Sequence, residues 1–174
     1  LVSMARPFLA DPDFVNKASQ DKSELIAPCI ACNQACLDHT FKGKISSCLV
    51  NPRACYEDEL ELKLVSNPKK IAIVGAGPAG LSAAITAAQV GHQVTLFEKE
   101  QELGGQLNLA KKVPGKEEFW GLVSWYENMI KILPAIEIKL NHTAEKKELV
   151  NFDKVIIATG VNPREPFILS LIHI

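Results

Sequence analysis

The sequence lacks any long apolar run. No stretch approaches the roughly 18 consecutive apolar residues that a membrane-spanning helix needs. Residues 1–8 have neither the basic segment nor the long apolar core of a secretory signal peptide. An excess of charge of one sign is also missing, because 19 lysines and arginines face 20 aspartates and glutamates, for a net charge of −1. These absences give no reason to expect a membrane or a nucleic acid as partner, and the cytoplasm is the expected location.

Cysteines are absent from most of the chain. All five lie between positions 29 and 55, whereas scattered cysteines would favour the disulfide framework of a secreted protein. Four of them follow the spacing C-x2-C-x3-C-x11-C: Cys29, Cys32, Cys36 and Cys48. One tight cluster in a chain of this size favours metal or redox chemistry.

Several kinds of site fit such a cluster. A structural zinc site typically has two pairs of ligands, and here the second pair is missing and His39 is the only histidine nearby. A [4Fe–4S] cluster needs four converging thiolates, often three in a short run and a remote fourth. We therefore predict a [4Fe–4S] site on the four spaced cysteines, with zinc or inert thiols as alternatives. Cys55 is a fifth candidate ligand, but because the other four already complete a set we interpret it as a small buried apolar residue.

Composition divides the 174 residues, which suffice for one globular domain and part of another. The apolar beginning runs directly into a loop, so we interpret the chain as a fragment. A helix is expected at residues 14–18, capped by Asp11 or Asp13, after a short remnant of a strand. The predicted segments are residues 1–20, a cysteine-rich segment at 21–58, a linker at 59–70, a regular domain at 71–168 and a foreign tail at 169–174.

The regular domain reads as a parallel α/β fold. A continuous apolar run predicts a strand at 71–74 that is buried on both faces, and a helix follows at 79–90, ended by Gly91. A strand at 93–98 completes a βαβ unit. The remaining elements expected are an amphipathic helix at 116–133, a half-exposed strand at 136–140 and a buried strand at 155–158.

A glycine-rich turn connects the first of these strands to its helix. Gly75 permits a tight turn, Gly77 allows the backbone to approach a pyrophosphate, and Gly80 lets the helix pack closely. The helix N-terminus then directs N–H groups at the phosphates. Glu98 ends the second strand, 18 residues after Gly80, where a carboxylate can accept hydrogen bonds from ribose hydroxyls. The turn predicts a dinucleotide site and, by itself, leaves NAD open beside FAD.

The surrounding residues resemble the FAD-binding domain of two-dinucleotide flavoprotein reductases. The likeness rests on residues 75–80, Glu98, residues 104–106 and residues 158–160. In that family the second glycine segment lies near the FAD pyrophosphate and flavin, and the third precedes an inserted NAD(P) domain. The resemblance favours FAD and adds these cofactor-binding residues: Pro78, Ala79, Gly105, Gln106, Ala158, Thr159 and Gly160.

Taken in order, the segments resemble bacterial NADPH-dependent 2,4-dienoyl-CoA reductases of the old yellow enzyme group. The likeness spans about residues 1–166 and is carried by these ranges: 4–12, 29–38, 47–55, 114–119 and 141–143. The resemblance implies an α/β fragment: the end of an FMN-binding TIM barrel at 1–20, the iron–sulfur segment, and an incomplete Rossmann-like FAD domain. It also implies that Ala5 and Arg6 contact the FMN phosphate and that Ala144 lies against the adenine.

The resemblance implies a relay of electrons. Hydride from NADPH would enter FAD, single electrons would cross the [4Fe–4S] cluster, and FMN in the barrel would reduce a dienoyl-CoA of fatty-acid β-oxidation. The acid–base residues of the barrel would lie upstream of Leu1 and the NADPH domain after Gly160. We therefore expect no catalytic residue in this chain, and small molecules, an acyl-CoA and NAD(P)H, as partners.

Other functions stay open on the sequence. An enoate reductase, a bile-acid reductase or an amine dehydrogenase of the same architecture would carry the same segments. An FAD and iron–sulfur subunit that serves a separate enzyme is disfavoured by the barrel-like residues 5–8, and a zinc-binding interaction module by the dinucleotide turn. The tail at 169–174 departs from the family, and we interpret it as the translation of a sequencing adaptor.

Overall fold

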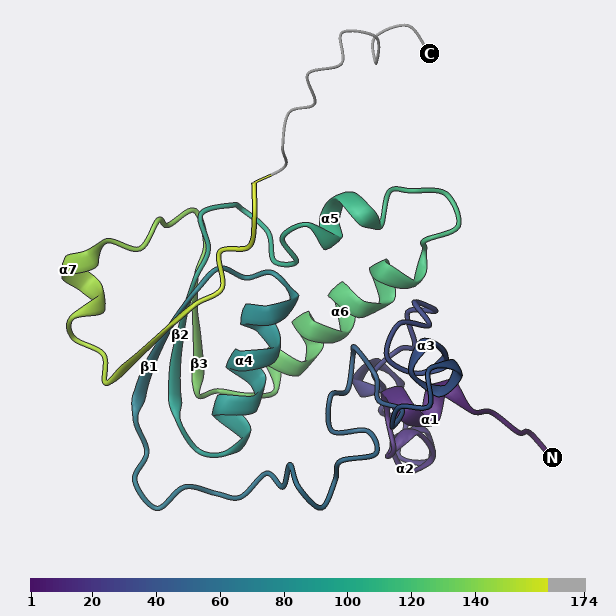
Figure 1. The fold of residues 1–174 in the computed structure, drawn as a ribbon. Coiled ribbons are helices and arrows are strands. Elements are labelled where there is room, and N and C mark those ends of the chain that lie inside the picture. Colours follow the sequence, from purple (N-terminus) through teal and green to yellow (C-terminus); the bar gives the residue numbers. More distant parts are fainter. Residues whose placement is uncertain (163–174) are drawn as a thin grey trace, which may run out of the picture.

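The centre of the molecule is a parallel sheet of four strands in the order β3-β2-β1-β4. The computed structural model describes residues 1–162, so the predicted tail at 169–174 lies outside the described residues. The strands, which run side by side in Figure 1, are β1 (Lys70–Val74), β2 (Gln93–Phe97), β3 (Ile136–Lys139) and β4 (Lys154–Ile157). All three pairings are parallel. The predicted α/β class and its strands are confirmed.

Two long helices cover one face of the sheet. Helix α4 (Pro78–Gln89) packs against β1, β2 and β3, and α6 (Glu118–Lys131) packs against α4 (Figure 1). Both were predicted within two residues at each end. Gly91 follows α4 with φ +100°, which is the left-handed conformation that ends helices. Two short helices, α5 (Leu107–Ala110) and α7 (Lys146–Leu149), were not predicted, because four residues are too few to show a helical period.

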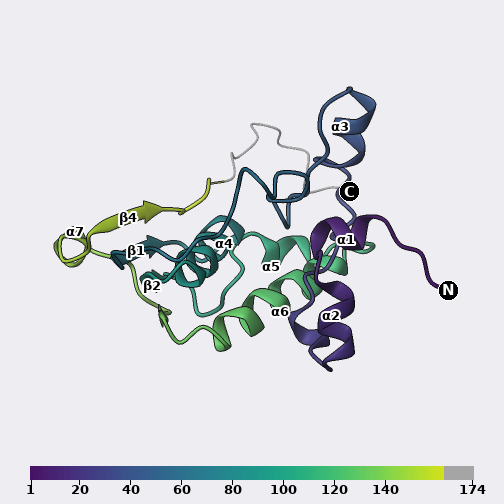
Figure 2. The same ribbon diagram turned by 90° about the horizontal axis from the view of Figure 1, so that it is seen from below.

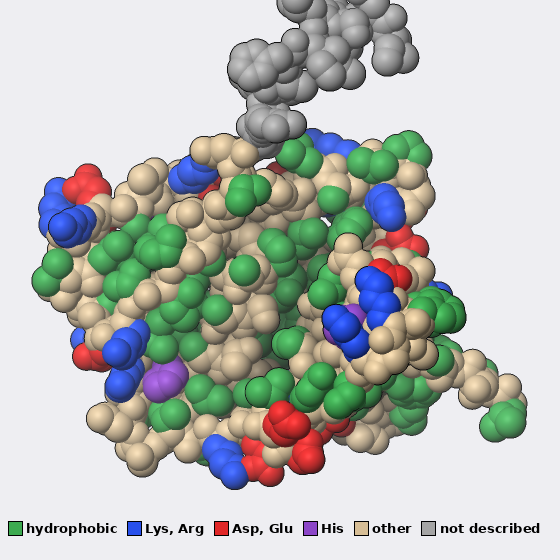
Figure 3. All heavy atoms as spheres, in the orientation of Figure 1, with side chains coloured by type: hydrophobic (Ala, Val, Ile, Leu, Met, Phe, Trp, Pro, Cys, Tyr) green, Lys and Arg blue, Asp and Glu red, His purple; other side chains and the backbone are tan. Residues whose placement is uncertain are grey.

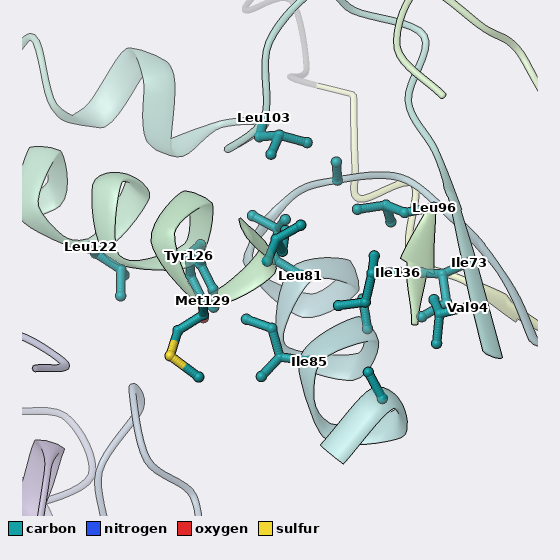
Figure 4. Packing of buried hydrophobic residues seen from close by; sticks show 14 of the residues in the cluster. Ile73, Leu81, Ile85, Val94, Leu96, Leu103, Leu122, Tyr126, Met129 and Ile136 are labelled. Carbon is teal, nitrogen blue, oxygen red and sulfur yellow. The ribbon is translucent and has the colours of Figure 1, made fainter. Parts of the chain in front are cut away.

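The hydrophobic core lies between the sheet and these two helices. Leu81 and Ile85 of α4 face Ile73 and Leu96 of the strands (Figure 4). The face of α6 that carries Leu122, Tyr126 and Met129 closes the same core. Because the apolar residues of α6 recur every three or four positions, they all fall on this one face.

The N-terminal third forms short helices that lie beside α6 (Figure 2). They are α1 (Arg6–Ala10), α2 (Phe14–Ser19), the 3-10 turn η1 (Ser23–Leu25) and α3 (Leu37–Phe41). The expected strand remnant is wrong, because its described residues form α1. Asp13 occupies the N-cap of α2 without a side-chain bond to the helix. Asp11 instead accepts the N–H of Asp13 at 3.0 Å and that of Ala27 at 2.8 Å.

Strand β4 differs from its prediction. It was expected to be buried, yet Val155, Ile156 and Ile157 are 40%, 37% and 66% exposed. The reason is position: β4 is the outer strand, it pairs only with β1, and no described helix packs on it as α4 packs on β1. Figure 3 shows hydrophobic side chains on this side of the molecule. Among residues 1–162 no helix is both long and apolar enough to span a bilayer.

Candidate functional site

The loops that carry the predicted cofactor residues meet at one end of the sheet. Strands β1, β2 and β4 are parallel, so the loops that follow them emerge at the same edge, the upper one in Figure 1. From β1 the chain passes to β2 on one side, while β4 lies on the other side. In open α/β sheets a point where the strand order reverses in this way is the usual ligand crevice.

The first glycine turn is packed too tightly for side chains at two positions. Gly75 has φ +105°, and a Cβ on it would lie 2.4 Å from the carbonyl oxygen of Ala158. A Cβ on Gly80 would lie 1.9 Å from the carbonyl oxygen of Gly75. Both distances are far below contact. The two glycines therefore allow the end of β1, the start of α4 and the end of β4 to approach one another.

Gly77 is different, because nothing lies within 4 Å of where its Cβ would be. It is the N-cap of α4 and makes no side-chain bond to the helix, and Pro78 and Ala79 beside it are exposed. The first N–H groups of α4 thus have no side-chain partner and face open space. The N-terminus of a helix of this length, with no side-chain cap on its N–H groups, suits a phosphate.

The second glycine segment lies directly against the first. The N–H of Gly104 donates to the carbonyl oxygen of Ala76 at 2.8 Å. Gly105 has φ +54°, and a Cβ on it would lie 2.9 Å from the Cα of Gly77. Glycine is therefore needed at position 105 for the two loops to touch.

The third segment, which follows β4, joins the same group. The side chain of Gln106 donates from Nε2 to the carbonyl oxygen of Val161 at 2.9 Å. Thr159 and Gly160 are exposed, and nothing lies within 4 Å of a Cβ on Gly160. Open backbone of this kind, next to a helix N-terminus, fits an extended dinucleotide.

Glu98 is buried at the end of β2, with 6% exposure. Its carboxylate accepts the N–H of Ala76 at 2.6 Å and the N–H of Glu100 at 3.0 Å. A carboxylate has about four acceptor positions, so capacity is left for a ribose hydroxyl. Glu98 thereby connects the adenosine side of the predicted site to the glycine turn.

The segment around Ala144 lies beside Glu98. The N–H of His142 donates to the carbonyl oxygen of Glu98 at 2.8 Å, and the imidazole lies 3.0 Å from Glu148. A capping box between Glu145 and Glu148 starts α7. The backbone N–H of Glu145, which donates to Glu148 at 2.9 Å, lowers the pKa of that carboxyl, and the hydrogen bond with His142 lowers it further. Ala144 is half-buried between these contacts.

The four spaced cysteines line one small cavity. Its walls consist of Arg6, Leu9, Cys29, Ile30, Cys32, Asn33, Ala35, Cys36, Cys48 and Leu49. The remote cysteine reaches the others because the N–H of Ser47 donates to the carbonyl oxygen of Ala35 at 2.7 Å. That bond brings the stretch before Cys48 against the stretch before Cys36, and Cys48 lines the same cavity as the other three cysteines. The chain thus folds back on itself to bring the fourth thiol to the cavity.

The backbone of this cavity is unusual. Ala31 and Asn33 have φ values of +51° and +59°, in the left-handed region that non-glycine residues seldom enter. Cys32 lies between them with a negative φ. Left-handed residues also occur in the backbone concavities that bind anions, among them many iron–sulfur sites. Arg6 donates to Asn33 Oδ1 at 2.6 Å, so the cation predicted to contact FMN lies at the edge of the cysteine cavity.

The four spaced cysteines share this cavity without forming a compact single-ion site. Within residues 1–162 no three His, Cys, Asp or Glu side chains lie close enough together to hold one metal ion. In a four-iron cluster each thiolate binds a different iron, so the cysteines stand farther apart than around one zinc. Burial raises the pKa of the Cys48 thiol, and the nearby Cys29 and Cys32 raise it further.

The structure corrects the interpretation of Cys55 and adds contacts of the cysteine segment that the sequence did not predict. Cys55 is exposed, with φ +66°, so its interpretation as a buried residue is wrong, and it does not line the cavity. The sequence did not predict the hydrogen bonds that hold the cysteine segment in place. Asp11 was interpreted only as a helix cap. The indole N–H of Trp125 donates to the carbonyl oxygen of Leu25, and the place of Trp125 in an amphipathic helix does not predict this long-range bond.

Comparisons with known proteins agree with this geometry. Residues 69–171 match the family model described as pyridine nucleotide-disulphide oxidoreductase. The chain is 43% identical to a metal reductase of Desulforamulus reducens and 41% identical to a cinnamate reductase of Clostridium sporogenes, covering 95% and 94% of this chain. A solved 2-naphthoyl-CoA reductase superposes with a TM-score of 0.90 at 36% identity, covering 95% of this chain and 26% of that one.

The chain spans about a quarter of the length of the curated relatives it matches, 25% in both cases above. Its matched part contains the parallel sheet, the glycine turn and Glu98. The family match therefore covers the same residues that form the candidate dinucleotide site. The chain belongs to the pyridine nucleotide-disulphide oxidoreductase family, and its relatives are oxidoreductases.

Proposed function

We propose that the chain is the electron-entry part of an NADPH-dependent 2,4-dienoyl-CoA reductase or a close relative. The observation that carries the proposal is the pairing of two sites in one packed body. Four cysteines line one cavity, and Ala27 and Val50 of the same segment belong to the core of the dinucleotide-binding domain. When bound, FAD and a [4Fe–4S] cluster would supply the change from two-electron hydride chemistry to one-electron transfer toward FMN.

The residues of this chain have separate parts in the proposal. Gly77, the N-terminus of α4 and Gly105 would hold the pyrophosphate, and Glu98 the ribose. The other FAD contacts would come from these residues: Gly75, Pro78, Ala79, Gly80, Gln106, Ala144, Ala158, Thr159 and Gly160. The cluster would be held by these residues: Cys29, Cys32, Cys36 and Cys48. Ala5 and Arg6 would contact the FMN phosphate from the barrel end.

The segment boundaries carry over as part of the proposal. Residues 1–20 would end an FMN barrel, 21–58 would hold the cluster, 59–70 would link and 71–168 would be FAD domain. Substrate choice would lie in the barrel. The 174 residues alone would then have no dienoyl-CoA reductase activity, which turnover of a dienoyl-CoA with NADPH by this purified chain would refute.

A second candidate is an enoate reductase of the same architecture, which would use this chain in the same way. The relative named cinnamate reductase, at 41% identity, favours it. The relative named 2-naphthoyl-CoA reductase, at 36% identity, favours an acyl-CoA. Assaying the complete protein with cinnamate and with a 2,4-dienoyl-CoA, each with NADPH, separates the two.

Anaerobic reconstitution tests the cofactors. The protein is incubated with iron, sulfide and FAD, freed of excess reagents, and assayed for iron, acid-labile sulfide and flavin. We expect a brown protein with about four irons and one flavin per chain. Cys48→Ser should abolish the brown colour, and Cys55→Ser, the matched control outside the cavity, should keep it. A colourless protein that binds zinc, or equal iron loss in both variants, would contradict the proposal.

A further inference from the structure

A helix of the dinucleotide-binding domain holds the segment that leads into the cysteine cavity. Trp125 of α6 donates from Nε1 to the carbonyl oxygen of Leu25 at 3.0 Å. Asn128, one turn later, donates from Nδ2 to the carbonyl oxygen of Glu24 at 3.3 Å. These bonds join positions about a hundred residues apart in the chain, and both acceptors lie just before Cys29.

The third contact on this face is steric. A Cβ on Gly121 would lie 3.7 Å from the side chain of Pro28, which precedes Cys29. Positions 121, 125 and 128 are spaced i, i+4 and i+7, so they lie on one stripe of α6. A Cβ at that distance would be in ordinary van der Waals contact, so Pro28 lies against α6 at position 121, while Trp125 and Asn128 bind the backbone that comes before it.

The other side of the same segment is also held. The carboxylate of Asp11 accepts the N–H of Ala27 at 2.8 Å, and Ala27 is 5% exposed. Ala27 belongs to the core together with residues of α4 and α6, and Cys48 packs against that core. The path into the cavity is therefore fixed between α6 and the N-terminal helices (Figure 2).

Helix α6 also contacts the cofactor end of the domain. It packs on α5, which begins directly after the Gly104-Gly105-Gln106 segment. Lys111, at the end of α5, places its ammonium 4.0 Å from the ring centroid of Trp120 on α6. Helix α6 thus contacts α5, which follows the second glycine segment. Another part of its surface contacts the cysteine segment.

We propose that Gly121, Trp125 and Asn128 form a positioning surface that sets the cysteine cavity relative to the glycine loops. The proposal rests on the proposed function, because it assigns FAD to the loops and [4Fe–4S] to the cavity. Electron transfer through protein slows steeply with distance, so a segment held on one face of α6 keeps the two groups at a constant separation. None of the three residues lines the cysteine cavity or belongs to the glycine loops.

The test uses the complete protein with three variants. Trp125→Phe keeps the ring packing and removes the indole N–H, and Asn128→Ala removes the second donor from a partly exposed position. Trp120→Phe is the matched control, because Trp120 lies on the same helix, is 55% exposed and makes no hydrogen bond to the cysteine segment. Phenylalanine keeps an aromatic ring against Lys111, so the contact with α5 is retained. The first measurement is amide hydrogen exchange of peptides covering residues 22–36, which needs no bound group.

Loss of one hydrogen bond should accelerate exchange in residues 22–36 about two- to tenfold in each of the first two variants. Iron release to a chelator should accelerate by a similar factor, at unchanged flavin content. In anaerobic stopped-flow with NADPH, bleaching of the iron–sulfur absorbance should slow while flavin reduction keeps its rate. Trp120→Phe should match the parent protein in every measurement.

Two results would overturn the inference: unchanged exchange in both variants, or the same acceleration in Trp120→Phe, which would mean a general effect of α6 stability. If the parent protein binds neither iron nor flavin, the proposed function fails and the positioning inference fails with it. If iron and flavin bind normally and exchange in residues 22–36 does not change, only the positioning inference fails.

Discussion

The carboxylate of Asp11 accepts the backbone N–H of Ala27 at 2.8 Å, across sixteen positions of sequence. Asp11 is only 3% exposed, and its other oxygen accepts the N–H of Asp13. Asp11→Asn replaces one acceptor by an amide that can only donate, so one backbone N–H loses its partner. It also removes the charge that pairs with Lys17. We expect the free energy of unfolding to fall by about 1–3 kcal/mol, measured by urea denaturation.

Asp13 provides the control for that change. It is exposed and its side chain caps nothing, so Asp13→Asn should alter the free energy of unfolding by less than about 0.5 kcal/mol. Equal losses in both variants would show that general charge, and not the Asp11–Ala27 bond, stabilises this region.

Gly80→Ala should destabilise the fold. The new Cβ would lie 1.9 Å from the carbonyl oxygen of Gly75, and backbone cannot move aside as a flexible side chain can. We expect the free energy of unfolding to fall by about 1–3 kcal/mol or more, visible in thermal unfolding or as insoluble protein. A variant that unfolds at the parent temperature would show that the turn relaxes easily.

Gly77→Ala should separate binding from stability. Nothing lies within 4 Å of the new Cβ, and φ at Gly77 is −74°, so the fold should tolerate alanine. The added methyl group would occupy the space proposed for the pyrophosphate, and FAD affinity should fall by about tenfold or more. Flavin fluorescence titration measures this. Unchanged affinity would place the phosphates elsewhere.

Glu98→Gln tests the buried carboxylate. The amide keeps only one acceptor oxygen, so the N–H of Ala76 or that of Glu100 loses its bond. The free energy of unfolding should fall by about 1–3 kcal/mol, and FAD should bind more weakly. Glu100→Gln, at a side chain that is 64% exposed, is the control and should change little in either measurement.

Tyr126 should make stability depend on alkaline pH. Burial raises the pKa of its phenol from 10.0 to about 12, so the folded protein favours the neutral form. Below pH 10 both states hold the proton and the full stabilisation is present. Above pH 10 the unfolded state ionises first, and up to about 2–3 kcal/mol of the free energy of unfolding is lost by pH 12.

The comparison variant is Tyr126→Phe, which lacks the titrating group. As pH rises from 9 to 11.5, the free energy of unfolding of the parent should fall by more than that of the variant. Guanidinium denaturation at several pH values measures it. Two curves that stay parallel would mean that Tyr126 ionises equally in both states.

The elements with a strong local pattern could be predicted, and those set by long-range partners could not. The run of apolar residues in β1 predicts burial correctly, because Ile71 and Ile73 are 7% and 0% exposed. The equally apolar β4 is exposed, because burial depends on what packs on a strand and not on the strand's own residues. Cys55 is a second example: cysteine is usually a buried residue type, but here it faces solvent.

The sequence by itself determined the parallel α/β class, the glycine turn with Glu98 and the cysteine spacing, because each depends on residues close along the chain. Only the tertiary structure decided that Cys48 reaches the cavity of the other three cysteines, that Gly105 touches Gly77, and that α6 holds the segment before Cys29. These contacts join distant positions through backbone hydrogen bonds and shared burial. No local pattern records such partners, since every backbone N–H and C=O looks the same in sequence.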